Sequence, residues 1–214
     1  MTIDVTPLVL IGGGGHASDV LQAIEALDDL GRTYLVVGLL DDAEVDPRRF
    51  VGRGVHQIGA VDDLASIDAQ YVVAAGWPAT RRALVERIGD GGTPANPIVH
   101  PKADLGVGVE LGVGTVVLGG AHVSPMVRMG RHGLVSYGAT VGHDTTFGEF
   151  ASVMPNAAVS GDVVAGDDVL VGTGACVLQG LRLGDRAQVG AGAVVVKDVG
   201  NDTTVVSLAA RPRP

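Results

Sequence analysis

The chain has 214 residues, enough for one large domain or two modest ones. Hydrophobic residues make up 46% of it but aromatic residues only 3%, which predicts an aliphatic core, and the formal net charge of −9 argues against nucleic acid as a partner. The single cysteine, Cys176, excludes an internal disulfide framework, and the lack of a signal-peptide pattern or spanning apolar run predicts a cytoplasmic protein without membrane insertion.

Residues 1–97 alternate strand and helix patterns, which predicts a small α/β domain. Residues 8–11 are all apolar, as in a buried parallel strand. Four glycines follow, and then a helical pattern with a plausible stop at Gly31.

Later segments of the same domain continue the alternation. Strands are predicted at 34–40 and 71–75, with a weak strand signal inside 55–63 and a second helix at 80–88. We therefore expect an open sheet of three or four strands. The Gly- and Pro-rich segment 89–97 is the predicted domain boundary.

Three strand ends are expected to meet at one edge of this sheet: Gly12–His16, Asp41-Asp42 and Gly76. Free N–H groups at the start of the first helix suit a phosphate, and the Asp pair suits ribose hydroxyls or a base. The sequence GGGGH does not match the dinucleotide fingerprint GxGxxG. A tight strand–helix turn and a solvated Asp pair therefore remain the simpler alternatives.

From Val99 to Val194 the chain divides into sixteen uninterrupted hexads. The first position is apolar in all sixteen, the second is Gly in nine, and the fifth is small or β-branched except at Leu181. Such a period predicts a repeat fold in which each hexad is a short strand plus a corner and three hexads make one coil. Residues 18 apart should then stack, and positions 138, 156, 174 and 192 carry Gly or Asn, which tolerate positive φ.

His143 is the histidine with the most suggestive surroundings. It occupies the third hexad position, at a predicted corner, and Gly161 one coil later leaves room beside it. Imidazole titrates near neutral pH, so it can act as a general base, and a carboxylate on its other nitrogen would fix the tautomer. Asp144 is the first candidate for that carboxylate and Glu149 the second. A solvated corner histidine is the alternative.

Four short motifs follow one another in order: Gly15-His16, Asp41-Asp42, Gly76 with helical Arg81, and His100-Pro101 before the hexads. Together they resemble the nucleotide-linked amino-sugar acetyltransferases of the bacillosamine and perosamine type, a family that includes sialic-acid O-acetyltransferase relatives. The resemblance runs from about residue 8 to 211. It implies a Rossmann-like α/β domain followed, over 98–214, by a left-handed parallel β-helix of hexapeptide repeats with a C-terminal tail.

The resemblance also implies an activity. It is an acetyl-CoA-dependent N-acetyltransfer, without an acyl-enzyme, to the amine of a nucleotide-linked amino sugar, usually a 4-amino-4,6-dideoxyhexose. It further implies a homotrimer with sites between neighbouring β-helices, and no metal. The implied residues are Gly14, Gly15, His16, Asp41, Asp42, Gly76 and Ser136 for the nucleotide sugar, His143 and Asp144 for catalysis, and Ser152, Gly161, Thr173 and Ala191 for acetyl-CoA.

The sequence departs from the family pattern at two places. Trp77-Pro78 follows Gly76 where the family has a small polar residue, and Ser152 replaces a family histidine, which puts one thioester or pantetheine contact in doubt. Trp77 either stacks on a base or sugar or packs at the domain junction. The nucleotide base, the sugar and the pathway are left open.

Three other functions are alternatives for this sequence. One is a sugar O-acetyltransferase of the sialic-acid type, and another is a non-catalytic β-helix binding protein. The third is a metal-dependent hydrase like the γ-type carbonic anhydrases, which requires histidines that converge on zinc. His122, His132 and His143 fall on different hexad positions and do not form one column, which disfavours the hydrase.

Overall fold

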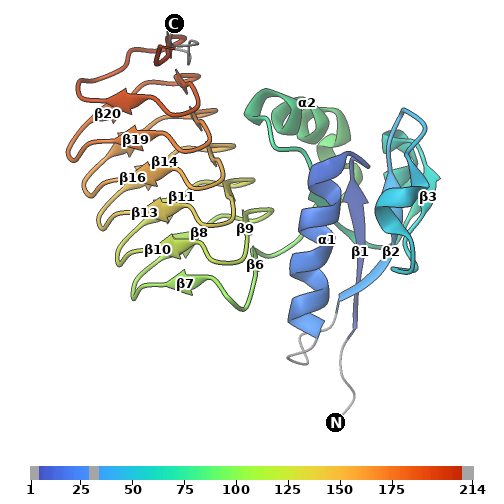
Figure 1. The fold of residues 1–214 in the computed structure, drawn as a ribbon. Coiled ribbons are helices and arrows are strands. Elements are labelled where there is room, and N and C mark those ends of the chain that lie inside the picture. The colour runs from blue at the N-terminus through green and yellow to red at the C-terminus, as the bar shows by residue number, and fades with distance from the viewer. Residues whose placement is uncertain (1–4, 29–33, 209–214) are drawn as a thin grey trace, which may run out of the picture.

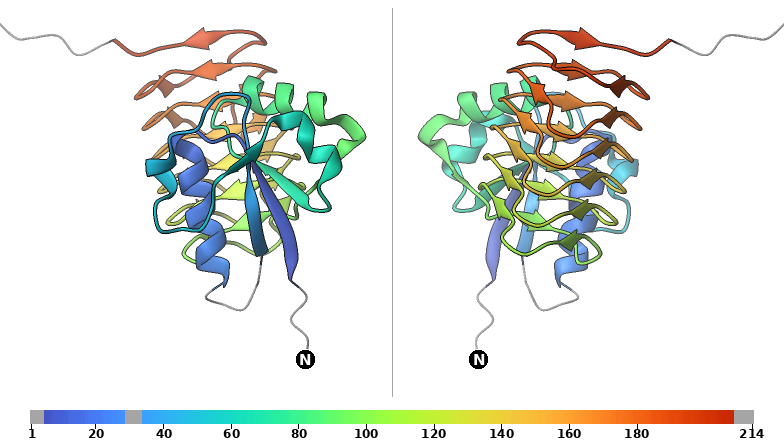
Figure 2. Two further views of the ribbon diagram at one scale, coloured as in Figure 1. Left: turned by 90° about the vertical axis from the view of Figure 1, so that its right-hand side faces the viewer. Right: turned by 90° about the vertical axis from the view of Figure 1, so that its left-hand side faces the viewer.

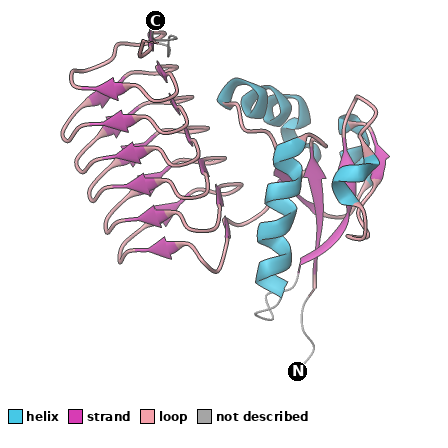
Figure 3. Ribbon diagram, viewed as in Figure 1, coloured by secondary structure: helices cyan, strands magenta, loops and turns pink. Residues whose placement is uncertain are grey.

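The computed structural model describes residues 5–28 and 34–208, which form an α/β domain beside a three-sided β-helix (Figure 1). Short strands and loops alternate along the β-helix, whereas both α-helices belong to the α/β domain (Figure 3). The fold class predicted from the hexads and from the family resemblance is confirmed.

The α/β domain is built on a parallel five-stranded sheet with the order β3-β2-β1-β4-β5. Its central strand is fully buried over Leu8–Ile11, as the apolar run predicts. The predicted helix stop at Gly31 lies outside the described residues. The elements are β1 Thr6–Ile11, α1 Gly15–Asp28, β2 Tyr34–Leu40, β3 Gln57–Gly59, β4 Gln70–Val73, α2 Pro78–Ile88 and β5 Thr93–Pro94, with 3-10 turns at Pro47–Phe50, Val61–Ser66 and Gly89–Gly91.

The prediction of three or four strands was wrong, because a fifth strand lies inside segment 89–97, the predicted domain boundary. Strand β5 pairs with β4 through Gln70↔Thr93 and Tyr71↔Pro94. Proline cannot donate a ladder hydrogen bond, so the segment has no strand signature, but an edge strand accepts it. Helix α2 also begins two residues before the predicted start, with Pro78 in its first turn.

The β-helix consists of two-residue strands in three sheets. Up to β22 (Val194–Val195) the paired residues are 18 apart, as in His122↔Thr140, which confirms three hexads per coil, whereas in the last coil they are 16 apart, as in Gln188↔Thr204. Face 1 contains β6 Ile98–Val99, β9 Val116–Val117, β12 Leu134–Val135, β15 Ser152–Val153, β18 Leu170–Val171, β21 Gln188–Val189 and β23 Thr204–Val205. Face 2 contains β7 Asp104–Leu105, β10 His122–Val123, β13 Thr140–Val141, β16 Ala158–Val159, β19 Cys176–Val177 and β22 Val194–Val195. Face 3 contains β8 Glu110–Leu111, β11 Arg128–Met129, β14 Thr146–Phe147, β17 Val164–Ala165 and β20 Arg182–Leu183.

The interior of the β-helix is filled by the first and fifth residues of the hexads. In one coil, for example, Val135, Ala139 and Val141 are at most 1% exposed. The four stacked corner residues predicted to adopt positive φ do so. Their φ values are 67°, 55°, 65° and 66° at residues 138, 156, 174 and 192. The repeat pattern thus specifies both the core and the turns.

The three corners are named here by their turn residues. Corner A joins face 1 to face 2 and holds Tyr137, Pro155, Thr173 and Ala191. Corner B joins face 2 to face 3 and holds His143 and Gly161. Corner C joins face 3 to face 1 and holds Glu149, Asp167 and Asp185.

The α/β domain packs on face 1 of the β-helix (Figure 2). On face 1, the outward side chains of the N-terminal coils, which lie lowest in Figure 1, are buried. Those of Val116, Leu134 and Ser152 are at most 2% exposed. Gln188 and Thr204 on the upper coils are exposed. The domain therefore covers the lower part of face 1 and leaves its upper part open.

A stack of three rings lies where the two domains meet. His132 is 1% exposed, and its ring lies between those of Tyr71 and Phe150, with centroid distances of 6.1 and 5.2 Å. Loss of hydration, with smaller contributions from Arg131 and Arg81, lowers the pKa of His132 to about 4.

We expect this histidine to make the fold sensitive to acid. Because the unfolded state binds the proton more readily, the free energy of unfolding falls as the pH drops from about 6.5 to about 4, by up to about 3 kcal/mol from this group alone. Urea unfolding at several pH values measures it. His132→Phe keeps a stacked ring and should remove that part of the pH dependence, whereas equal pH slopes in the two proteins would contradict the assignment.

No helix within residues 5–28 and 34–208 is long and apolar enough to cross a lipid bilayer.

Candidate active site

The glycine loop joins β1 to α1 and leaves its backbone open. Gly12 has a φ of 100°, and the N–H of Gly13 donates to Asp41 Oδ2 at 2.7 Å. A Cβ at Gly13 would come within 2.2 Å of the Val45 side chain, whereas Gly14 and Gly15 face open space. The N-terminus of α1 is therefore accessible to a phosphate.

The two predicted aspartates point in different directions. Asp41 accepts from the N–H groups of Gly13 and Ala43, so its carboxylate holds the glycine loop. Asp42 accepts from Arg87 and from the Val61 N–H, and the bond to Arg87 lowers its pKa. The two carboxylates thus have different partners in the structure, and a role for Asp42 in nucleotide binding stays a prediction.

His16, in the first turn of α1, lies beside the glycine loop. Its Nδ1 is 3.5 Å from the carboxylate of Asp19 one turn later, and its side chain is 18% exposed. Its position at the helix start, next to the open Gly15, is that expected for a residue near a bound phosphate.

Arg81 of α2 fixes the end of β4 against the β-helix. It is 2% exposed and donates to the carbonyl oxygens of Ala75 and Gly76 in its own domain. It also donates to the carbonyl oxygens of His132, Phe150 and Ala151 and to the Ser152 hydroxyl. Burial lowers its pKa to about 10, so it remains charged at neutral pH. We call this group the Arg81 network.

Ser152 belongs to this network. Its side chain is 0% exposed, and its hydroxyl accepts from Arg81 at 2.8 Å and donates to the Gly76 carbonyl at 3.0 Å. The structure does not support the prediction that the Ser152 side chain contacts acetyl-CoA, because its hydroxyl is buried and already bonded to Arg81 and Gly76. It positions Gly76 instead.

His143 and Asp144 form an exposed pair at corner B. His143 Nδ1 lies 2.7 Å from Asp144 Oδ2, and each side chain is 60% exposed. A Cβ at Gly161 would come within 2.8 Å of His143 Nε2, so the imidazole lies directly over this glycine. With Asp144 ionised, Nδ1 carries the proton and Nε2 presents a lone pair.

Other acidic and histidine side chains near this coil are engaged elsewhere. Glu149, the second candidate acid, lies 2.9 Å from Arg131 Nε. His132 is buried in the ring stack and His122 lies 2.9 Å from Asp104. Over residues 5–28 and 34–208, no group of three His, Cys, Asp or Glu side chains could hold a metal ion.

The corners differ in whether their backbone N–H groups have a hydrogen-bond acceptor. At corner C, the N–H groups of Glu149, Asp167 and Asp185 donate to side-chain oxygens one coil on, at 2.8–3.1 Å. Within the described part of the chain, the N–H groups of Gly161, Thr173 and Ala191 have no acceptor. Corners A and B therefore offer free donors, and corner C does not.

The predicted residues fall into two groups on different corners. Thr173 and Ala191 lie at corner A, where they line a cavity of about 210 Å³ with Trp77 and Met154. A Cβ at Gly76 would lie 3.9 Å from Met154, so this residue, which follows the end of β4, also lies beside corner A. His143, Asp144 and Gly161 lie at corner B, across face 2. One copy of the chain does not bring the two groups together.

Ser136 precedes corner A and is 3% exposed, next to the exposed Tyr137. Ser136 therefore lies with the predicted residues at corner A, but its burial limits its contact with a sugar.

Sequence reasoning missed two structural features around this site. The acidic column at corner C could have been found from the 18-residue spacing of Glu149, Asp167 and Asp185. Arg81 was noted as part of a motif, but its bonding to three carbonyls of the β-helix could not be read from the chain.

Comparisons with known proteins find similar chains and folds. The PglD N-terminal domain family matches residues 7–88. The acetyltransferase domain of PglB from Neisseria gonorrhoeae FA1090 is 31% identical, with a TM-score of 0.84 over 97% of this chain and 99% of that chain. Another structure of that domain contains acetyl coenzyme A. PerB from Caulobacter crescentus, in complex with CoA and GDP-perosamine, is 29% identical, with a TM-score of 0.83 over 97% of each chain. No protein of curated function matches the chain by sequence.

Proposed function

Because the chain belongs to the family of nucleotide-linked amino-sugar acetyltransferases, we propose that it transfers acetyl from acetyl-CoA to a sugar amine by general-base catalysis at His143. The observation that carries the mechanism is the His143–Asp144 pair at 2.7 Å, with Nε2 over Gly161 and no side chain above it. The enzyme class is an acetyl-CoA-dependent N-acetyltransferase.

The reaction moves one proton in two steps, from the amine to His143 and from His143 to the departing thiolate. The amine nitrogen attacks the thioester carbonyl and forms a C–N bond, and Nε2 of His143 accepts the amine proton. The C–S bond then breaks, and the imidazolium returns the proton to the thiolate of CoA. Asp144 stabilises the imidazolium in between. The free N–H of Gly161 is available to the negative charge that develops on the carbonyl oxygen.

Acetyl-CoA is proposed to lie along corner A. Pantetheine is an extended chain with two amides, so it needs donors beside a surface without bulky side chains. The free N–H groups of Thr173 and Ala191 and the neighbouring Gly172 and Gly190 provide this combination. In addition, the glycine loop at the start of α1 is proposed to bind the nucleotide phosphates.

We propose a homotrimer that brings corner B of one copy to corner A of the next. The lower part of face 1 is covered by the chain's own α/β domain, and face 3 carries the charged side chains of Glu110, Arg128 and Arg182. The upper coils of face 2 present neutral side chains, including Cys176 and Val194, both exposed in a single copy. Face 2, which separates corners A and B, is therefore the face to turn toward the trimer axis.

Cys176 tests this arrangement without any mutation, because it is the only cysteine of the chain and lies on face 2. We expect a thiol reagent to label it slowly in the native assembly and quickly once the copies separate. Sedimentation measures the assembly state under the same conditions. Equally fast labelling in a confirmed trimer would place face 2 outside the interface.

The acceptor is proposed to be a 4-amino-4,6-dideoxyhexose linked to a nucleoside diphosphate. The test is release of the CoA thiol from acetyl-CoA against a panel of UDP-, dTDP- and GDP-linked 4-amino sugars. Turnover with one of them identifies the nucleotide and the sugar. If no amino sugar is acetylated but a sugar hydroxyl is, the enzyme is an O-acetyltransferase. The cytoplasmic location stays a prediction.

A further inference from the structure

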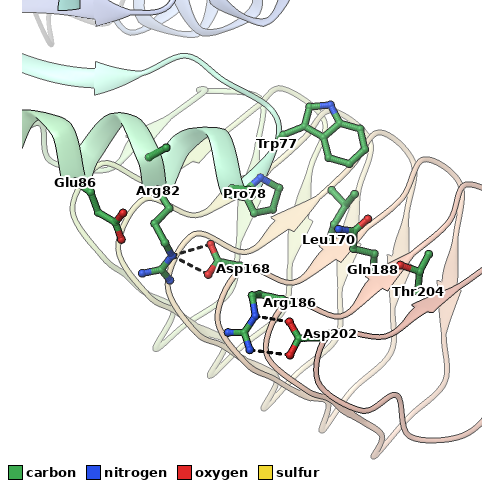
Figure 4. A pocket seen from close by; sticks show the side chains of 12 residues that line it. Trp77, Pro78, Arg82, Glu86, Asp168, Leu170, Arg186, Gln188, Asp202 and Thr204 are labelled. Atoms are coloured by element: carbon green, nitrogen blue, oxygen red, sulfur yellow. Dashed lines mark hydrogen bonds and ion pairs between the residues drawn. The ribbon is translucent and has the colours of Figure 1, made fainter.

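Trp77, the only tryptophan of the chain, stands exposed between two hollows on the open part of face 1 (Figure 4). Its side chain is 59% exposed at the start of α2. It borders the cavity of about 210 Å³ at corner A and a second one of about 380 Å³ that reaches Arg82 and Arg186. An indole that remains this exposed leaves most of its large apolar surface in water.

The backbone beneath this indole is held firmly. The Gly76 carbonyl accepts two hydrogen bonds, from Arg81 Nη1 at 2.9 Å and from the Ser152 hydroxyl at 3.0 Å. Pro78 follows directly and is buried. The position of Trp77 is therefore set by the Arg81 network and not by contacts of its own ring.

The cavity at corner A combines an apolar wall with polar backbone. Trp77, Met154 and Leu170 form the wall, and Thr173 and Ala191 present N–H groups that have no acceptor within the described residues. None of the glycine-loop residues, and neither Asp41 nor Asp42, lines either hollow. The ring therefore faces the surface proposed for acetyl-CoA and not the surface proposed for the nucleotide.

We propose that Trp77 is a cofactor-positioning residue, whose ring packs against the pantetheine arm of acetyl-CoA and closes the groove at corner A. This inference rests on the proposed function. It excludes stacking of Trp77 on the nucleotide base or the acceptor sugar. In this arrangement Ser152 contributes indirectly. It does not contact the ligand, but its hydroxyl fixes Gly76 and so the start of the Trp77 wall.

The fluorescence of the single tryptophan tests this inference without any substitution. In the intact protein, CoA should shift Trp77 emission to shorter wavelength, because the ligand removes water from the ring. UDP, dTDP and GDP should leave the emission unchanged. Calorimetry on the same samples measures whether each ligand binds.

Steady-state kinetics provide the second test. Trp77→Ala should raise the KM for acetyl-CoA by about 3- to 10-fold, the range for loss of one aromatic contact, and leave the KM for the nucleotide sugar unchanged. Trp77→Phe keeps a ring and should retain most of the affinity. Size and thermal melting of both variants confirm that they fold, as expected for an exposed side chain.

The outcomes separate the two proposals. CoA binding by calorimetry without a change in Trp77 emission, or a raised KM for the nucleotide sugar alone, would overturn the role of Trp77 and leave the proposed function standing. Absence of CoA binding by the intact protein would overturn the proposed function, and the role of Trp77 with it.

Discussion

His143→Ala should lower kcat by about 10²- to 10⁴-fold, the usual contribution of a general base, and change the KM for either substrate little. The reason is that the side chain is 60% exposed and is paired with the exposed Asp144, so its removal should act on proton transfer and not on the fold. The measurement is CoA thiol release at saturating acetyl-CoA and acceptor, once the panel has identified the acceptor.

A matched control is available in the same β-helix. His122 also pairs with a carboxylate, with Nδ1 2.9 Å from Asp104 Oδ2, but it lies on face 2 and not at a corner. In a variant that keeps the native oligomeric state, His122→Ala should keep wild-type kcat within about threefold, far above the loss for a general base. Full turnover by His143→Ala would refute the base assignment and leave the fold and family unaffected.

Two neighbours of His143 refine the same prediction. Asp144 has a φ of 58°, a conformation that Asn tolerates well, so Asp144→Asn changes the charge with little effect on the backbone. It should reduce kcat less than His143→Ala does. Gly161→Ala would place a methyl group within 2.8 Å of Nε2, and it should impair catalysis by displacing the ring.

Arg81→Ala should reduce the free energy of unfolding by at least about 4 kcal/mol, because several buried acceptors lose their donor at once. The guanidinium donates to five carbonyl oxygens and one hydroxyl across the domain junction. Each buried acceptor left without a partner costs about 1–3 kcal/mol. Urea unfolding followed by circular dichroism measures the loss.

Arg82, the next residue, serves as the matched control. Its side chain is 27% exposed and it pairs with the carboxylate of Asp168 at 2.7 Å, which is itself only 9% exposed. Arg82→Ala therefore leaves one buried acceptor without its partner and should cost about 1–3 kcal/mol, less than Arg81→Ala. Arg81→Lys keeps the charge but cannot reach all the acceptors. Its loss in free energy of unfolding should therefore lie between those of Arg82→Ala and Arg81→Ala. If Arg81→Ala were no more damaging than Arg82→Ala, the Arg81 network would not hold the domains together.

The β-helix could be predicted from the sequence because its stability rules are local and repeat. An apolar first residue, a small fifth residue and Gly or Asn at residues 138, 156, 174 and 192 specify the strand, the interior and the turn of each coil. The same frame placed His143 at a corner with Gly161 above it, so the catalytic candidate followed from periodicity and was strengthened by the family resemblance.

A further regularity in the sequence indicates which face is covered. The outward residues of face 1 on the lower coils are Val116 and Leu134, whereas those of face 3 at the same levels are Glu110 and Arg128. Apolar side chains that point outward from a β-helix need a cover, and the α/β domain provides it.

The tertiary structure alone decided which partner each polar side chain takes. Asp41 and Asp42 are adjacent and identical in the sequence, yet one holds the glycine loop and the other binds Arg87. Ser152 falls on a position suited to a cofactor contact and is instead buried under Arg81. A periodic pattern determines where a residue lies on its own element, but the partner is determined by whichever distant element packs there, and this depends on contacts between residues far apart in the chain.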